Sequence, residues 1–284
     1  MNILSSIIDT ETNDLTTAVN SAREIMQEII LSGLSRADFF KHAAFQGGTC
    51  LRIFHDLDRF SEDLDFCLTD DEYPLDLEKL SRSVINETRS LGMDLEISPN
   101  KRQVRQTVGF KIKGNTRSIL EVFGFNEDVI RSADPDMKIN IKIDIETDVG
   151  DGFRLDHVYR AQPMNYDCTL LDMTSLFAGK TAAVIGRNWK DRFKGRDLYD
   201  FEWYVKNNTH LNMRYLEHKL RRDGILTDAD FNGTILKDLL KERFKVIDYV
   251  SAYTDIEFFV DADERPVDWD VNHFIGLLDD LKRD

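Results

Sequence analysis

The 284-residue chain has only three cysteines, and no apolar run in it approaches the ~20 residues that a membrane-spanning helix needs. Cys50, Cys67 and Cys168 are odd in number and widely spaced, which argues against a disulfide framework and against a zinc site. The N-terminus lacks the basic segment and apolar core of a secretion signal. These absences predict a protein of the reducing cytoplasm without a membrane segment.

Several chemical signatures are also missing. The sequence contains no Gly-x-Ser-x-Gly motif, no P-loop and no Rossmann fingerprint, and its histidines lack metal-ligand spacing. The net charge of -15 argues against non-specific wrapping of long nucleic acids. Residues 180–196 reverse this charge, because six basic residues against one acidic residue give +5. A solvated helix end and a polyanion-binding surface explain this basic stretch equally well.

The apolar fraction of 42% and the charged fraction of 31% are those of an ordinary globular protein. Hydrophobic periodicity predicts an α/β (α+β) fold in two lobes. A lobe with a mixed sheet covers residues 1–155, and an all-helical lobe covers 156–284. Predicted strands are 43–45, 63–68, 94–98, 103–113, 117–124, 139–146 and a weak 256–260, with a hairpin loop at 113–116. Predicted helices are 14–32, 35–41, 49–56, 75–91, 170–186, 196–206, 211–222, 228–240, 240–252 and 268–282.

The most informative segment begins with Gly47-Gly48-Thr49 and ends with Asp63-Leu64-Asp65-Phe66. A Gly-Gly-Thr turn that leads into a helix offers backbone N–H groups and a hydroxyl to a phosphate. On a strand, residues i and i+2 point to the same face, so Asp63 and Asp65 can converge on a hard cation such as Mg²⁺. A strand with capping acids is the plainer alternative, but aspartate is disfavoured inside strands.

A two-metal phosphoryl-transfer site needs a third carboxylate from a neighbouring strand. The strand 139–146 has isoleucines on one face, and its other face carries Asn140, Lys142, Asp144 and Glu146. We favour Asp144 as the third metal ligand, with Glu146 as its competitor. A solvated polar face is the alternative.

The predicted helical lobe supplies further candidates. Lys180 lies within an apolar helical stripe, so its ammonium either reaches the surface or neutralises a triphosphate. Asp197 lies in the first turn of another helix, and if enclosed it requires a partner such as Lys180 or Arg196. Arg59 and Ser61 precede the metal carboxylates and are candidate phosphate contacts. The alternative for Arg59 is an ion pair with Glu62 or Asp58. The alternative for Ser61 is that it orders the turn.

Residues 43–206 resemble the AbiEii/AbiGii nucleotidyltransferase toxins, of the DNA polymerase β-like superfamily and of type IV toxin–antitoxin systems. The resemblance rests on Gly47-Gly48-Thr49, on Arg59-Phe60-Ser61-Glu62-Asp63-Leu64-Asp65-Phe66, and on Lys180 with Arg196-Asp197-Leu198-Tyr199-Asp200. Gln46 stands where the family often has lysine.

The resemblance implies that Asp63 and Asp65 bind Mg²⁺, that Gly47, Gly48 and Thr49 cradle the triphosphate, and that Lys180 contacts the nucleotide with Asp197 as a further active-site acid. It also implies a nucleotidyltransferase fold for the lobe 1–155, transfer of a nucleotide from an NTP, in some members onto tRNA 3′ ends, and an antitoxin encoded nearby. Two Mg²⁺ ions would be held by Asp63, Asp65 and Asp144, with Lys180 and Asp197 from the helical lobe completing the cleft.

Two other functions are compatible with parts of the sequence. A metal-dependent glycosyltransferase also uses Asp-x-Asp, but it explains neither the upstream Gly-Gly-Thr nor the distant lysine. A nucleotide-binding interaction protein without transfer activity would need Asp63 for binding but not Asp144.

Overall fold

A computed structural model of the protein describes residues 10–100, 107–148, 150–187, 194–227, 230–260 and 265–284. The chain forms two compact units. The sheet unit comprises Met1–Ile53, Ser61–Val149 and Asp156–Leu170. The helical unit comprises Phe54–Phe60, Gly150–Leu155 and Leu171–Asp284, so the short segment before the Asp-x-Asp motif belongs with the C-terminal helices.

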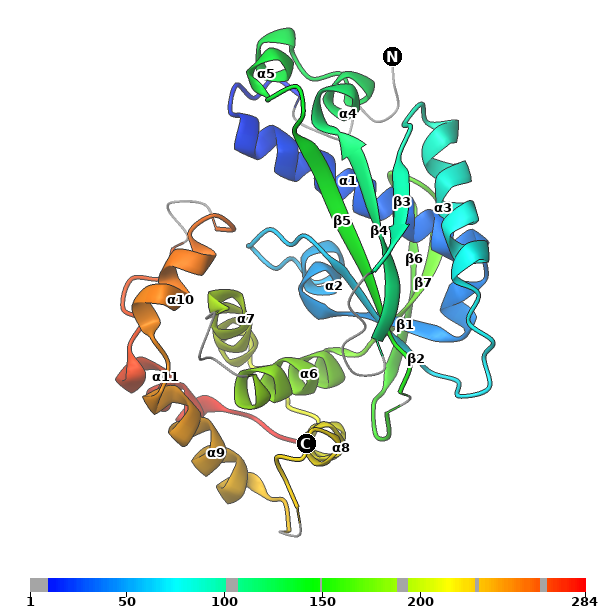
Figure 1. The fold of residues 1–284 in the computed structure, drawn as a ribbon. Coiled ribbons are helices and arrows are strands. Elements are labelled where there is room, and N and C mark those ends of the chain that lie inside the picture. Colours follow the sequence, from blue (N-terminus) through cyan, green and yellow to red (C-terminus); the bar gives the residue numbers. More distant parts are fainter. Residues whose placement is uncertain (1–9, 101–106, 149, 188–193, 228–229, 261–264) are drawn as a thin grey trace. The chain divides into compact units, whose positions relative to one another are not determined.

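The sheet unit contains a mixed sheet of seven strands in the order β3-β4-β5-β2-β1-β7-β6 (Figure 1). Its central strands β5 and β2 are parallel, whereas β4 with β5 and β1 with β2 are antiparallel. The strand bounds are Ala43–Gln46 (β1), Leu64–Leu68 (β2), Glu96–Pro99 (β3), Thr107–Asn115 (β4), Lys138–Glu146 (β5), Leu155–Arg160 (β6) and Tyr166–Leu171 (β7). The predicted α/β class with a mixed sheet is confirmed.

The apolar face of β5 belongs to the core of the sheet unit. Ile139, Ile141, Ile143 and Ile145 are each at most 1% exposed, as their alternation predicts. Helix α1 (Leu15–Arg36) packs against β5 and against helices α3 (Leu77–Ser90) and α4 (Thr116–Phe123). In Figure 1, α1 runs behind the strands. The opposite, polar face of β5 is therefore the side on which functional side chains can stand.

The predicted strand at 117–124 is wrong, because these residues form helix α4. The Asn115 side chain caps this helix by accepting a hydrogen bond from the Ser118 backbone N–H. Ile119, Leu120 and Phe123 then follow at helical spacing and are buried. The expected hairpin loop at 113–116 is wrong for the same reason, since β4 extends to Asn115 and α4 begins at Thr116.

The predicted loss of strands after residue 156 is also wrong. Strands β6 and β7 lie there, and β7 pairs with β1 in parallel. Cys168, Leu170 and Leu171 of β7 are at most 2% exposed, and such a buried strand carries apolar residues on both faces instead of alternating ones. The weak strand at 256–260 is not formed either, because Ile256 ends a helix and its carbonyl accepts the N–H of Phe259 in a turn.

Helices dominate the helical unit, as predicted. Their bounds are Met173–Gly186 (α6), Gly195–Lys206 (α7), Met213–Arg222 (α8), Gly233–Lys245 (α9), Tyr249–Ile256 (α10) and Val271–Asp280 (α11). Aromatic side chains such as Phe177, Phe201, Phe244 and Phe274 are fully buried between them. Two further short helices, α2 (Gly47–Phe54) and α5 (Glu127–Ser132), occur earlier in the chain. Within the described ranges, no helix combines the length and the apolarity that a membrane span requires.

Candidate active site

Three of the predicted acids stand on the polar face of the sheet. Strands β2 and β5 pair in parallel with Asp65 directly beside Asp144, so the two side chains point to the same face. Asp63 lies two residues before Asp65, and its carboxylate accepts the backbone N–H of Lys142 on β5. The structure therefore sets Asp65 beside Asp144 on two neighbouring strands, with Asp63 immediately before the first of them.

Asp63 is the carboxyl whose pKa is most directly tied to this arrangement. Partial desolvation raises its pKa, the charge of Lys142 lowers it, and the charges of Glu62 and Asp144 raise it further. The net shift is upward. Asp63 is exposed to solvent, so its desolvation is incomplete. The repulsion from Asp144 shows that the two carboxylates share one electrostatic environment.

Both oxygens of Asp144 already have partners. Asn100 Nδ2 donates to Asp144 Oδ1 at 2.8 Å and to the Ile143 carbonyl at 3.2 Å. The ammonium of Lys142 forms an ion pair with Asp144 Oδ2. The competitor Glu146 lies beside Cys67 instead of Asp65 and accepts a 3.4 Å hydrogen bond from Gln46. Asp144 is thus the better placed of the two strand acids relative to Asp65.

The Gly-Gly turn lies against the same carboxylates. Gly47 has a φ of +83°, in the left-handed region, and a Cβ atom there would lie 2.7 Å from Asp65 Oδ2. A side chain at this position would both strain the backbone and displace the carboxylate. Glycine at position 47 therefore allows the start of α2 to approach Asp65, while Gly48 is buried one residue later.

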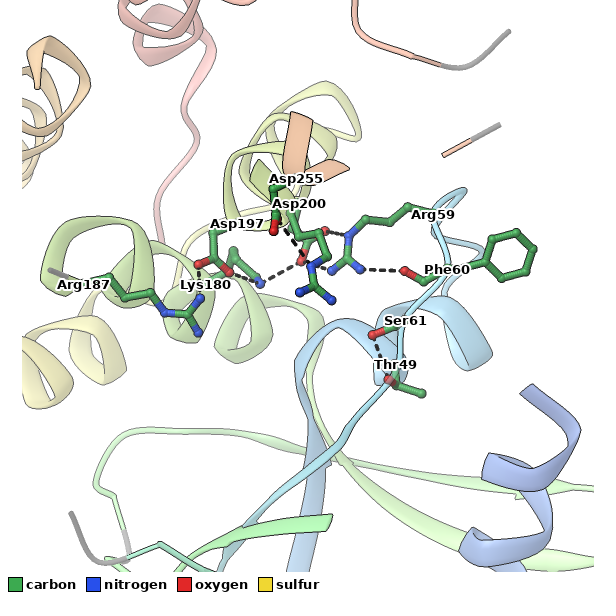
Figure 2. A network of polar contacts seen from close by, with 10 residues as sticks. Thr49, Arg59, Phe60, Ser61, Lys180, Arg187, Asp197, Asp200 and Asp255 are labelled. Carbon is green, nitrogen blue, oxygen red and sulfur yellow. Dashed lines mark hydrogen bonds and ion pairs between the residues drawn. The ribbon is translucent and has the colours of Figure 1, made fainter. Parts of the chain in front are cut away.

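The two hydroxyls predicted to bind phosphate have protein partners. Thr49 is 1% exposed, and its hydroxyl donates to the backbone carbonyl of Asp63. The same hydroxyl lies 2.8 Å from Ser61 Oγ, as Figure 2 shows. Thr49 and Ser61 thus tie α2 to the segment that carries Asp63, and their predicted phosphate contacts remain predictions.

In the helical unit, Lys180 lies between two buried acids (Figure 2). Its ammonium on α6 is 2.8 Å from Asp197 Oδ1 and 2.7 Å from Asp200 Oδ2, both on α7. Asp197 and Asp200 are three residues apart, so one helix face presents both carboxylates. Asp197 is 3% exposed and Asp200 is fully buried. The predicted enclosure of Asp197 and its pairing with Lys180 are confirmed.

Arg59 completes this network from within the same unit. Its Nε and Nη2 donate to the two oxygens of Asp200 at 2.6 and 2.7 Å, and its Nη1 donates to the Phe60 carbonyl at 2.9 Å. Arg59 is only 2% exposed. This bidentate geometry makes Asp200 its ion-pair partner. Every nitrogen of the guanidinium thus has a protein partner, and the predicted phosphate contact of Arg59 remains a prediction.

The acids of this network are outnumbered by cations. Arg187 also forms an ion pair with Asp197, so Arg59, Lys180 and Arg187 face two carboxylates. Burial opposes ionisation of Asp197, but the charges of Lys180 and Arg187 outweigh it and hold its pKa well below the usual value. Both acids are therefore ionised at neutral pH, and the network carries a surplus positive charge.

The basic stretch 180–196 is divided by these contacts. Lys180 and Arg187 pair with Asp197, and Arg196 pairs with Asp255 at 3.6 Å. Lys194 is half-buried, and its pKa is lowered by burial and then by the neighbouring charge of Arg187. Lys190, Asp191 and Arg192 lie outside the described residues. The polyanion-binding interpretation of this stretch stays a prediction.

The donor chemistry of the three sheet acids suits a hard divalent cation, because carboxylate oxygens are the ligands that Mg²⁺ prefers. Asp65 and Asp144 are neighbours in register, as such a site requires. Over the described part of the chain, however, no group of three His, Cys, Asp or Glu side chains is gathered closely enough to hold a metal. At this place Lys142 forms an ion pair with Asp144.

Sequence reasoning gave no role to three residues that the structure places in these networks. Asp200 was visible in the sequence as the acid three positions after Asp197, a spacing that shares a helix face. Asn100 lies 44 residues before its partner Asp144, and nothing local in the sequence links the two. Arg187 was counted only as part of the basic stretch. Contacts between side chains that are distant in the chain could not be predicted from the sequence.

Comparisons with known proteins identify a family and several similar solved structures. A family model described as "Nucleotidyl transferase AbiEii toxin, Type IV TA system" matches residues 29–273. Among solved structures, JHP933 from Helicobacter pylori is similar at 18% identity, with 90% of this chain and 87% of that chain covered and a TM-score of 0.48. MenT4, a nucleotidyltransferase toxin from Mycobacterium tuberculosis H37Rv, is similar at 16% identity, with 93% and 85% covered and a TM-score of 0.45. No curated protein sequence matches the chain. The family match spans both units and includes every predicted site residue.

Proposed function

Because this chain belongs to the AbiEii family of type IV nucleotidyltransferase toxins, we propose that it uses Mg²⁺ to transfer a nucleoside monophosphate from an NTP to the 3′ end of a tRNA. The family establishes nucleotidyl transfer and the toxin–antitoxin context. The metal, the acceptor and the residue roles are our proposal. The cognate antitoxin would be encoded nearby, and the cytoplasm, where NTPs and tRNA are found, would be the site of action.

One observation supports this proposal above all others. The register of β2 and β5 sets Asp65 beside Asp144, and the left-handed Gly47 brings the start of a helix against the Asp65 carboxylate. A helix start presents free backbone N–H groups, which suit a phosphate. Acidic metal ligands next to a phosphate-binding turn are the two parts that nucleotidyl transfer requires.

Each residue of the sheet unit has a proposed role. Asp63, Asp65 and Asp144 would hold two Mg²⁺ ions, which when bound would stabilise the attacking and leaving oxygens. Asp144 would assist deprotonation of the acceptor hydroxyl. The hydroxyl oxygen then forms a bond to the α-phosphorus of the NTP, and the bond to pyrophosphate breaks. Gly47 and Gly48 would direct backbone N–H groups to the triphosphate.

Lys180 and Asp197 of the helical unit would act in the same reaction. A lysine provides a point charge to phosphate oxygens, and only two carboxylate contacts of the Lys180 ammonium are described. The same ammonium would donate to a phosphate oxygen of the nucleotide. Asp197 would hold Lys180 in position, and Arg59 would act indirectly by orienting Asp200. The surplus cation of this network favours an anionic ligand.

The proposal is tested by incubating the purified protein with bulk tRNA and each α-³²P-labelled NTP in Mg²⁺. We expect label in tRNA with the wild-type protein and none with D65N, a variant that keeps the size of the side chain but removes its charge. Sequencing of RNA 3′ ends from cells expressing either protein identifies the acceptor. Unextended tRNA ends in the wild-type culture, together with unlabelled tRNA in vitro, would exclude tRNA as the acceptor.

The family membership favours this reaction over the two alternatives drawn from the sequence. A metal-dependent glycosyltransferase would consume labelled UDP-sugar in the same assay. A nucleotide-binding protein without transfer activity would keep its biological effect after Asp144→Ala. We expect neither result.

A further inference from the structure

Lys142 occupies an unusual place for a basic residue. It stands on β5 two positions before Asp144, so the two side chains share the polar face of the sheet. Its ammonium forms an ion pair with Asp144 Oδ2, and the Lys142 and Asp144 side chains are 37% and 19% exposed. Its charge also acts on Asp63, whose carboxylate accepts the Lys142 backbone N–H. Lys142 therefore interacts with two of the three acids, Asp144 and Asp63.

The two oxygens of Asp144 differ in what holds them. Oδ1 accepts a 2.8 Å hydrogen bond from Asn100, whose amide also donates to the Ile143 carbonyl. A Cβ atom on Gly109 would lie 1.9 Å from that carbonyl and 3.1 Å from Asn100 Nδ2, so glycine on β4 makes room for this contact. Among the described residues, Oδ2 pairs with the ammonium at the end of the long Lys142 side chain. A cation that binds Asp144 therefore competes with Lys142 for Oδ2.

We propose that Lys142 is a built-in counter-ion that holds the cation position at Asp144 until a divalent metal replaces it, while Asn100 keeps the carboxylate oriented for the exchange. This inference rests on the proposed function, since it concerns the same three acids. Without a cation, three carboxylates on two adjoining strands repel one another. The ammonium offsets part of that repulsion in the metal-free protein, and it raises the metal concentration that the site requires.

The two residues then have opposite effects on metal affinity. Removing the ammonium leaves a more negative site without a competing cation, so Lys142→Gln should lower the Kd for Mn²⁺ by about threefold or more, given what a partly exposed ion pair contributes. Removing the orienting amide should do the reverse, so Asn100→Ala should raise the Kd by about tenfold. A merely structural role for either residue would not produce shifts of opposite sign.

Lys138 offers a matched control. It lies on the same face of β5, its side chain is 43% exposed, and it pairs with Glu96 at 3.3 Å. It is six residues from Asp144, or roughly 20 Å along the strand. Lys138→Gln therefore removes the same charge from the same strand without touching the acids, and the Kd for Mn²⁺ should stay at the wild-type value.

The experiment is a titration of the full-length protein with Mn²⁺, without nucleotide, followed by electron paramagnetic resonance of the free ion. D65N identifies the binding that belongs to this site, and thermal melting verifies that each variant is folded. Lys142→Met serves as a second variant of the key position. Tighter Mn²⁺ binding in both Lys142 variants, with no change in Lys138→Gln, supports the inference.

Unchanged or weaker binding in folded Lys142 variants overturns the inference, and so does wild-type Mn²⁺ binding that D65N leaves intact. Labelled NTP transfer by the wild-type protein, measured in parallel, distinguishes these outcomes from failure of the proposed function. Transfer that persists while Lys142 has no effect on metal affinity would refute the counter-ion alone.

Discussion

The buried pair of Arg59 and Asp200 gives the sharpest prediction about stability. Arg59 is 2% exposed and Asp200 is fully buried, and two hydrogen bonds of 2.6 and 2.7 Å join them. The change Arg59→Met keeps the aliphatic volume and removes the guanidinium. Breaking a buried pair from one side costs about 3–5 kcal/mol, because the remaining charge is left in the interior. Asp200 retains Lys180 at 2.7 Å, which places the expected loss near the lower end, about 3 kcal/mol.

The chain offers a specific probe for this measurement. Two of the three tryptophans, Trp203 and Trp269, lie in the described part of the helical unit, so tryptophan fluorescence during urea denaturation reports on that unit. The control is Lys245→Met on α9, which breaks an exposed pair with Glu242. Such a pair contributes at most about 1 kcal/mol. The double variant Arg59→Met/Asp200→Met should recover part of the loss, because no uncompensated charge then remains.

The reasoning is refuted if Arg59→Met lowers the free energy of unfolding no more than the Lys245→Met control does. It is equally refuted if the double variant is less stable than the single one, since the cost would then come from lost packing instead of from a stranded carboxylate. Arg59→Lys refines the test. Lysine keeps the charge but cannot form the bidentate contact, so an intermediate loss is expected.

Two further predictions concern Gly47 and Asp197. Gly47→Ala should abolish nucleotidyl transfer, because its Cβ would lie 2.7 Å from Asp65 Oδ2. Gly224→Ala is the matched control, since Gly224 has a φ of +71° and no atom lies within 4 Å of its Cβ. This control should retain activity at a similar cost of about 1 kcal/mol in backbone strain. The pKa of Asp197 is lowered in the folded protein, so its contribution to stability is complete above the ordinary aspartate value of 3.8 and is lost as the pH falls through the lowered pKa. The difference in free energy of unfolding between wild type and Asp197→Asn should therefore be constant above pH 3.8 and shrink below it.

A specific result would contradict each of these two predictions. Transfer activity in Gly47→Ala equal to that of Gly224→Ala would show that the close approach to Asp65 does not matter for the reaction. A stability difference for Asp197→Asn that shrinks on going from acid to neutral pH would mean that the folded protein raises, instead of lowers, the pKa of this carboxyl.

Local sequence patterns predicted much of the fold correctly. The alternation of β5 and the helical periodicity of the C-terminal half reflect how each element buries one face, which nearest neighbours in the sequence reveal. The predictions were wrong where a helix cap, or burial of both faces of a strand, decided the secondary structure. Residues 116–123 became a helix because Asn115 caps it, and β7 was missed because a strand buried on both faces does not alternate.

In the candidate site too, some features could be predicted from the sequence and others could not. Asp63, Asp65, Lys180 and Asp197 could be singled out because a charged residue in a strand or an apolar stripe needs a chemical reason. The register that sets Asp65 beside Asp144 was not available, since it joins strands almost eighty residues apart. The partners of Arg59 were equally hidden, because Asp200 is 141 residues away.

The amino-acid sequence by itself determined where most of the helices and the alternating strands lie, which face of each is apolar, and which side chains are chemically out of place. Only the tertiary structure decided how those side chains are paired. It paired Arg59 with Asp200, and it gave Asp144 the two partners Asn100 and Lys142. The reason is physical, because periodicity is a property of one element, whereas an ion pair depends on packing between elements distant in the chain.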